Sequence, residues 1–241
     1  MSGPRYLTPT RGMLGQDNNQ VRSMRALHVF EGFFVAVLLG IFSYFVLDAR
    51  ITTFFHHLVM SHVMLHKYVS HIPDFLFQIV LAMTISCWTV LSVWFARGIQ
   101  NVHTRFMQLC GVSVPLAYMV KTVLQYAFGR ADPRMWLLHP HVTGFHWFHG
   151  GSGYTSFPSG HMTVFVALAA ALWLQYPRYR KVYMTGVGLL GAALVATNYH
   201  FVSDVVAGTY LGILICYICD FGLVATSESY RATRSAVSVG D

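Results

Sequence analysis

The sequence predicts an all-α polytopic membrane protein, a six-span helical bundle with an amphipathic segment after the first span. Composition is the first reason: 55% of the 241 residues are hydrophobic and 10% are charged, whereas about 25% are charged in a typical soluble domain. So few charges cannot cover a water-exposed surface. The second reason is a set of six apolar runs, against the roughly 20 residues that cross a bilayer core: 28–48, 75–96, 106–128, 162–176, 183–199 and 205–225.

The stretch 51–74 is apolar but interrupted by five histidines and Lys67. A seventh span would have to bury all of these polar groups. One or two amphipathic helices at the membrane interface are the better interpretation. The fourth and fifth runs are the shortest of the six, so their limits are the hardest to place.

No Pro/Ser-rich linker or change of composition divides the chain, which predicts a single membrane-embedded domain over 28–226. Residues 1–27 lack the apolar core and cleavage site of a signal peptide and are interpreted as a flexible cytoplasmic arm. Residues 227–241 form a cytoplasmic tail. The four cysteines lie within the predicted spans as packing residues, and Cys216 and Cys219 lack the turn of a redox motif.

Basic residues orient the bundle, because cytoplasmic loops of membrane proteins are enriched in Lys and Arg. In a six-span arrangement most of them fall on one side: Arg5, Arg11, Arg22, Arg25, Arg97, Arg105, Arg178, Arg180, Lys181, Arg231 and Arg234. Both termini are therefore expected in the cytoplasm of a bacterial inner membrane, and the 129–160 loop faces the periplasm. The net charge of +7 follows from topology, so nucleic acid is not an expected partner.

Two short motifs carry the candidate chemistry. His200 and Asp204 are four residues apart, which makes them neighbours on a helix face. The carboxylate can fix the tautomer of the imidazole and make its other nitrogen a nucleophile; a polar pair that closes a helix end is the alternative. In Pro158-Ser159-Gly160-His161, Pro158 favours a helix first turn, whose N–H groups favour an anion. His161 can protonate a leaving oxygen there.

Cationic side chains flank these motifs. Arg130 and Arg134 follow the third span and are natural bidentate ligands of an anion, or anchors to lipid headgroups. Lys121 lies deeper in the same span, where an ammonium group needs a polar cavity. Asp132 or a bound phosphate is its expected partner.

These residues resemble the type 2 phosphatidic acid phosphatase family, which includes lipid phosphate phosphatases and shares its core fold with vanadium haloperoxidases. The family pattern is Lys-x6-Arg-Pro, Pro-Ser-Gly-His and Ser-Arg-x5-His-x3-Asp, and the resemblance covers about residues 115–215. It implies that His200 becomes a phosphohistidine, that Asp204 orients it and that His161 is the general acid. Ser159 and the Gly160 backbone would hold phosphate oxygens.

The phosphate-binding half of the pattern is altered. Gln125 and Asp132 stand at the first motif's Lys and Arg positions, and Lys121 and Arg130 are the expected substitutes. In the third motif Ala193 and Leu194 replace Ser-Arg. Hydrogen bonds from the residues just before His200 are expected instead, from Asn198 or Tyr199.

A histidine-rich loop lies between these motifs and contains His139, His141, His146 and His149. Histidine clusters favour zinc and similar ions, but polar loop residues beside the site are the simpler interpretation. His146 or His149 would then supply part of the phosphate grip. We assign no metal and no other cofactor.

Together these features predict an integral-membrane lipid phosphatase that acts at the outer face through a phosphohistidine. The candidate substrates are phosphatidic acid, phosphatidylglycerol phosphate, polyprenyl pyrophosphate and a lipid A phosphate. A lipid phosphotransferase with the same His/His/Asp core is the main alternative. A non-catalytic protein, or one with a histidine-ligated metal or haem, is a distant one. The sequence leaves the lipid and the oligomeric state open.

Overall fold

The computed structural model describes residues 11–60, 72–98, 103–139 and 144–237. Most of these residues are helical, and an isolated bridge between Arg130 and Phe145 is their only β pairing. In chain order the elements are α1 (Arg11–Phe42), a π-helical turn (Ser43–Leu47), α2 (Asp48–Met60), α4 (Ile72–Ala96), α5 (Thr104–Phe128), α6 (Pro133–Leu138), α7 (Gly160–Gln175), a 3-10 turn (Pro177–Tyr179), α8 (Arg180–Ala196) and α9 (Val202–Val237).

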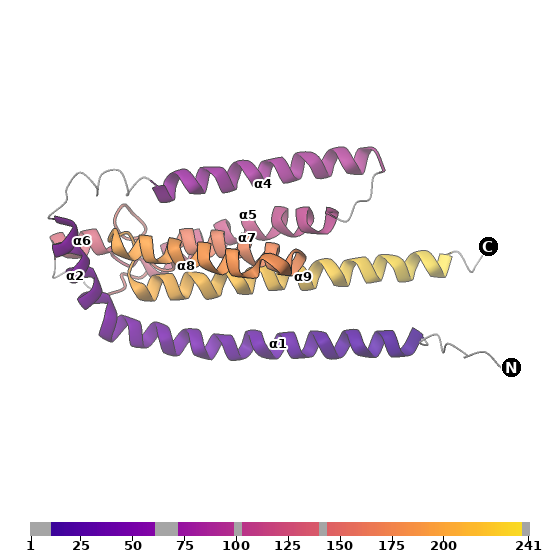
Figure 1. Ribbon diagram of the computed structural model, residues 1–241, viewed down its shortest axis with the longest axis horizontal. Helices are drawn as coiled ribbons and strands as arrows, with labels where there is room; N and C mark the ends of the chain where they lie inside the picture. Colours follow the sequence, from indigo (N-terminus) through magenta and orange to yellow (C-terminus); the bar gives the residue numbers. More distant parts are fainter. Residues whose placement is uncertain (1–10, 61–71, 99–102, 140–143, 238–241) are drawn as a thin grey trace.

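The long helices run along one common direction, with α7 and α8 beside α5 and α9 in the middle of the bundle (Figure 1). The short helix α6 and helix α2 lie together at one end, whereas α1 begins and α9 ends at the other. Small side chains let α5, α7 and α9 pack closely, among them Cys110, Ala167 and Cys216, which are completely buried. All four cysteines are free thiols buried in the bundle, as predicted.

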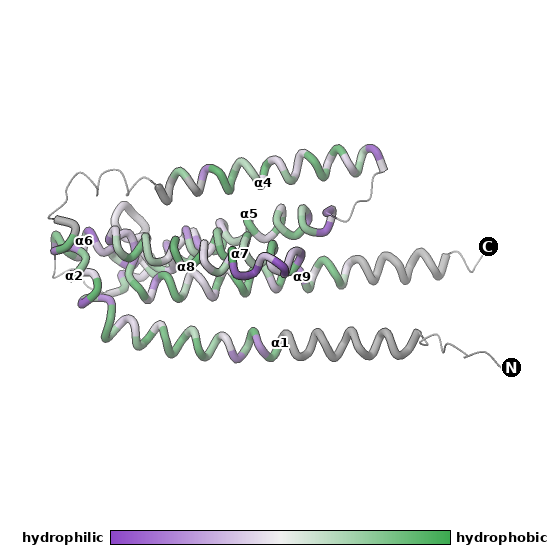
Figure 2. Tube along the Cα trace, in the orientation of Figure 1, coloured by the Kyte–Doolittle hydropathy of each residue, from purple (hydrophilic) through white to green (hydrophobic). Residues whose placement is uncertain are grey.

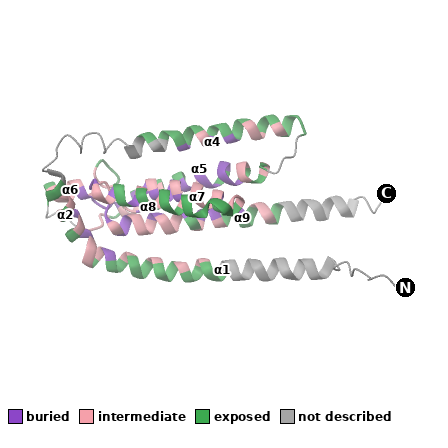
Figure 3. Cartoon of the chain, viewed as in Figure 1, coloured by how far each residue is buried: buried purple, intermediate pink, exposed green. Residues whose placement is uncertain are grey.

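Four helical segments in the described residues are long and apolar enough to cross a membrane: Leu27–Leu58, Gln78–Ala96, Thr104–Phe128 and Val202–Thr226. Their outer surfaces are apolar, and the described side chains of α1 and α4 in particular are largely hydrophobic and exposed (Figures 2 and 3). Such surfaces suit lipid rather than water. The protein is an integral membrane protein. Each of the six predicted apolar runs contains a helix, although α8 ends at Ala196, before the predicted limit at 199. Helices α7 and α8, with 16 and 17 residues, fall short of the length of a full span.

The first span bends at the π-helical turn, and α2 then crosses the end of the bundle near α6 (Figure 1). Such turns commonly bend helices and occur often at functional sites. This part of the predicted amphipathic segment, up to Met60, is helical, whereas 61–71 lies outside the described residues. Helices α1 and α9 reach Arg11 and Val237, inside the ranges assigned to the arm and tail. The domain limits at 28 and 226 therefore stay predictions.

Candidate active site

The two predicted catalytic histidines meet at the end of the bundle that holds α2 and α6. His161 lies in the first turn of α7, and His200 lies in the short connection between α8 and α9. Their ring centroids are 6.0 Å apart, and the Tyr199 ring packs against both, at 5.3 Å and 5.7 Å. Residues separated by almost forty positions thus form one site.

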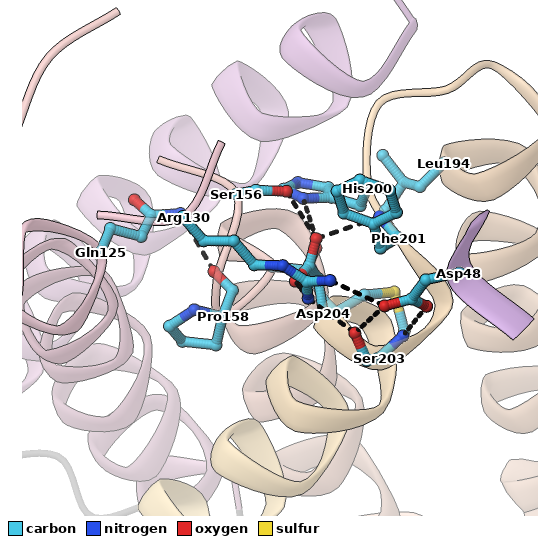
Figure 4. Close-up of polar contacts among 12 residues, drawn as sticks. Asp48, Gln125, Arg130, Ser156, Pro158, Leu194, His200, Phe201, Ser203 and Asp204 are labelled. Carbon is cyan, nitrogen blue, oxygen red and sulfur yellow. Dashed lines mark hydrogen bonds and ion pairs between the residues drawn. The ribbon is translucent and has the colours of Figure 1, made fainter. Parts of the chain in front are cut away.

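Asp204 lies beside His200 but makes its hydrogen bonds elsewhere. Nδ1 of His200 is 3.8 Å from Oδ2 of Asp204, an ion-pair distance beyond hydrogen-bond range. Asp204 accepts hydrogen bonds from the Ser156 hydroxyl, the Phe201 amide and Arg130 (Figure 4). Among the described residues Nδ1 of His200 has no hydrogen-bond partner. The predicted pair is therefore present, but the expected hydrogen bond between its members is not formed.

Arg130 is held between two carboxylates. It is 4% exposed, and its Nη2 donates to Asp48 Oδ2 at 2.7 Å, while its Nη1 donates to Asp204 and to Ser203 Oγ (Figure 4). Burial lowers the pKa of Arg130, but the charges and hydrogen bonds of the two carboxylates outweigh this effect and raise the pKa above its usual value. This residue was the expected phosphate ligand, yet Nη1 and Nη2 are both committed to protein acceptors.

Arg134 is the guanidinium that is available beside the histidines. Its Cζ lies 4.8 Å from the centroid of the Tyr199 ring. Its Nε and Nη2 are buried and lack a hydrogen-bond partner among the described residues. Asp132, at the motif Arg position, is the N-cap of α6 and accepts from the Met135 amide at 2.7 Å. That cap begins the helix whose first turn carries Arg134.

Lys121 lies against the turn that begins α7. A Cβ added to Gly160 would be 3.1 Å from Lys121 Cδ and 3.3 Å from Gln125 Nε2. Gln125, at the motif Lys position, donates to the Pro158 carbonyl at 3.0 Å and accepts from Lys121 Nζ at 3.3 Å. The partner of Lys121 is therefore Gln125 and not Asp132, because Asp132 is bound into the cap of α6.

Ser159 is part of the start of α7. It is completely buried, its hydroxyl accepts from the Met162 amide at 3.4 Å, and its own amide donates to the Asp204 carbonyl at 3.1 Å. These bonds join α7 to α9 and fix the direction of the first turn. The first amides of a helix have no acceptor within the helix, and the anion-binding character of this turn stays a prediction.

The connection from α8 to α9 replaces the missing Ser-Arg pair with an apolar support. Leu194 is completely buried in a cluster with Met162 and Val166, and its carbonyl accepts the His200 amide at 3.2 Å. Asn198 adopts a left-handed backbone conformation (φ 52°), which asparagine tolerates better than most residues. Its buried Oδ1 has no partner among the described residues. The side-chain amide of Asn198 therefore stays a candidate for a polar contact with the substrate.

The histidine-rich loop is attached to the end of α5. The His146 amide donates to the Gly129 carbonyl at 3.1 Å, and the rings of His146 and His149 pack against Tyr154. His149 is exposed, whereas Nε2 of His146 is buried without a partner among the described residues. His141 lies outside them. In the described parts of the chain no group of three or more His, Cys, Asp or Glu side chains is placed to hold a metal ion.

Gly129 is the position where an added side chain would most disturb the contact between the histidine-rich loop and the end of α5. Its φ is 54°, and an added Cβ would lie 1.9 Å from the His146 carbonyl oxygen. We expect Gly129→Ala to lower the thermal unfolding temperature and the activity, because backbone must move. Gly98→Ala is the control, since Gly98 also has a positive φ (65°) but no atom of the described residues within 4 Å of an added Cβ. Equal melting temperatures for the two variants would show that the clash is absent.

The sequence analysis missed three residues of the site: Asp48, Ser156 and Ser203. Asp48 carried a signal, because an acidic residue at the end of an apolar run is costly in a membrane and suggests a function. Ser156 and Ser203 had none, since serines beside motifs are common. Their hydroxyls donate to Asp204 and to Asp48, respectively.

Known proteins resemble the part of the chain that builds this site. The family model of the PAP2 superfamily matches residues 106–221. Residues 106–221 belong to the PAP2 superfamily. This segment holds His161, His200 and Asp204, whereas Asp48 lies outside it.

Two curated relatives are lipid A 1-phosphatases. The protein from Rhizobium johnstonii is 38% identical over 103 residues, and the one from Rhizobium etli is 37% identical over 103 residues. The matches cover 42% of this chain but only 41% and 43% of the relatives' lengths. Among solved structures, a transmembrane PAP2-type phosphatidylglycerolphosphate phosphatase from Bacillus subtilis matches with a TM-score of 0.43 and 18% identity, over 82% of this chain and 96% of that one.

Proposed function

We propose that the protein is a six-span membrane phosphatase that hydrolyses a lipid phosphate or pyrophosphate at the periplasmic face through a phosphohistidine. The observation that carries this proposal is the histidine pair, His161 and His200. Beside it lie Arg134 Nε and Nη2, which have no hydrogen-bond partner in the described part of the chain. This site lies at the end of a bundle of apolar helices. The PAP2 match to the same segment supports the reaction class.

The reaction has two displacements at phosphorus. With Nδ1 of His200 facing Asp204 and carrying the proton, Nε2 has the free lone pair and attacks the phosphorus in line. The bond from phosphorus to the lipid or pyrophosphate oxygen breaks, and His161 donates a proton to that oxygen. Water then attacks the phosphohistidine while His161 takes its proton, the N–P bond breaks, and inorganic phosphate leaves.

The charge on the transferring phosphoryl group is held by a rearranged set of donors. Arg134 Nε and Nη2 are free to donate, Lys121 lies against Gly160, and the first amides of α7 point out of the helix. Arg130, in contrast, stabilises Asp204. We therefore assign the phosphate grip to Arg134 and Lys121, with contributions from Asn198 and from His146 or His149.

A lipid A phosphate is the substrate class that we favour among the four candidates, because two relatives of the PAP2 segment are lipid A 1-phosphatases. The shape of the molecule agrees with a lipid. An apolar groove of about 860 Å³ lies between α7, α8, α9 and α2. It begins at Met162, next to His161, and at Val202, next to Phe201. It follows α7 to Leu174, about 18 Å at the helical rise per residue, which suits an acyl chain.

Two glycines of α8 test this groove. Gly188 lines it and Gly186 does not, and neither has an atom within 4 Å of an added Cβ. We expect Gly188→Phe to lower kcat/KM about tenfold for a long-chain lipid phosphate and to leave a short-chain substrate unaffected. Gly186→Phe should change neither. Equal effects of the two variants on both substrates would show that the groove does not bind the acyl chain.

The function itself is tested by phosphate release from a panel of lipid phosphates and pyrophosphates, including lipid A, by the purified protein in detergent. Release that continues in EDTA supports the metal-free phosphohistidine reaction. A second series with an added acceptor lipid distinguishes hydrolysis from transfer, since a phosphotransferase would form a phosphorylated acceptor. No turnover of any substrate in either series, with the protein folded, would refute both activities.

A further inference from the structure

Asp48 is joined to the active site by three hydrogen bonds. It is the first residue of α2 and is 3% exposed. One carboxylate oxygen accepts from Arg130 Nη2 at 2.7 Å and from the Ser203 hydroxyl, and the other accepts from the Ser203 amide at 3.0 Å. Asp48 thus contacts both the arginine and the helix that position Asp204 (Figure 4).

The three groups form a buried triad, Asp48–Arg130–Asp204, in which each side chain is 5% exposed or less. Two carboxylates and one guanidinium carry a net charge of −1. A buried net charge is unfavourable unless a cation lies nearby. Nδ1 of His200 lies 3.8 Å from the triad, and this ring becomes cationic when it is protonated or phosphorylated.

Besides Asp48, the charged or titratable groups around His200 include one carboxylate, Asp204, which is paired with Arg130. Asp204 belongs to α9, Arg130 follows the end of α5, and His161 belongs to α7. Arg134 belongs to α6 and packs on the ring of Tyr199, which in turn packs against the histidines. If Asp48 were absent, Arg130 would neutralise Asp204 alone. The excess negative charge therefore depends on Asp48.

We propose that Asp48 is a positioning residue that acts through Arg130 and Asp204 to keep a net negative charge beside His200. The charge stabilises the positive imidazole of the phosphohistidine and of its transition state. This inference rests on the proposed phosphatase reaction. It gives Arg130 the role of balancing the charge of Asp204. Because Arg130 is occupied in this way, Arg134 binds the phosphate instead.

The test is the pH profile of kcat/KM in Asp48→Asn, which keeps the shape of the side chain and removes its charge. A nearby negative charge favours the protonated form of an imidazole, and attack requires the neutral ring, so activity should rise with pH as the ring loses its proton. Without the Asp48 charge we expect the acidic limb to move down by about one pH unit. We expect kcat to fall about tenfold as the intermediate loses stabilisation.

Three further variants separate charge from structure. Asp48→Glu should keep the wild-type acidic limb. Ser203→Ala removes hydrogen bonds of the network but no charge, so it should also leave the limb in place. Asp220→Asn breaks another Arg–Asp pair, with Arg105 near the opposite end of α5, and should leave both activity and limb unchanged. A limb that moves equally in Ser203→Ala and Asp48→Asn would overturn the proposal.

A measurement without turnover makes this test independent of the proposed function. NMR titration of the ¹⁵N-labelled His200 ring should give a lower pKa in Asp48→Asn than in the wild type. Asp48→Ser serves as a second neutral variant if Asn does not fold. An unchanged pKa in a folded neutral variant refutes the role of Asp48, whereas a shifted pKa in a protein that releases no phosphate refutes only the phosphatase.

Discussion

Replacing His200 with alanine is expected to reduce phosphate release by at least about a thousandfold, because the attacking nitrogen is removed. The change should leave the fold intact, since the His200 amide, and not its ring, bonds to the Leu194 carbonyl. The assay is initial-rate phosphate release in detergent, with helical circular dichroism to confirm folding.

The matched control for this variant is His103→Ala. His103 precedes α5 at the end of that helix away from Arg130, and its ring bonds to the Tyr176 hydroxyl. We expect this variant to keep most of the wild-type rate. A His200→Ala protein that still released phosphate at more than a tenth of the wild-type rate would remove His200 from the role of nucleophile.

Replacing Arg134 with glutamine is the second large effect that we expect, a fall in kcat/KM of about 10²- to 10³-fold. The loss of one charge-stabilising donor from a water-excluded site has this order of magnitude. Because the Nε and Nη2 atoms of Arg134 have no protein partner in the described residues, removing them should change folding stability little. Arg134→Lys should recover part of the activity, since it keeps the charge but loses the fork.

Arg130→Gln gives the contrasting result. Breaking a buried ion pair by removing one partner costs about 3 to 5 kcal/mol of stability, so this variant should unfold at a lower temperature. Thermal unfolding and kcat/KM measured together therefore separate the two arginines. Normal kinetics in folded Arg134→Gln would return the phosphate grip to Arg130 or Lys121.

The helices and the histidine pair could be predicted from local sequence, whereas the partners of the charged residues could not. Long apolar runs predict helices wherever they occur, and the motif Pro158-Ser159-Gly160-His161 by itself predicts the start of a helix. The roles of Arg130 and Arg134 depend instead on Asp48, which is 82 positions from Arg130 in the chain. Position in the sequence treats both arginines as phosphate ligands, because it contains no information on which carboxylate lies beside each.

The substitutions in the family motifs show the same limit. Asp132 and Gln125 looked like losses of phosphate ligands, but in the structure each makes hydrogen bonds to the protein. Asp132 caps α6, and Gln125 donates to the Pro158 carbonyl and accepts from Lys121 Nζ. An N-cap can be recognised from sequence, since Asp-Pro is a common helix start. The contact of Gln125 with a loop 33 positions away cannot.

The most direct test of the account is to trap the covalent intermediate. Purified protein is mixed with a ³²P-labelled lipid phosphate, quenched within the first turnover, and digested for peptide mapping. We predict label that is stable to alkali and labile to acid, as expected of a phosphohistidine, on the peptide that contains His200 and absent in His200→Ala. Label on a different residue, or turnover without labelled protein at any quench time, would contradict the phosphohistidine reaction.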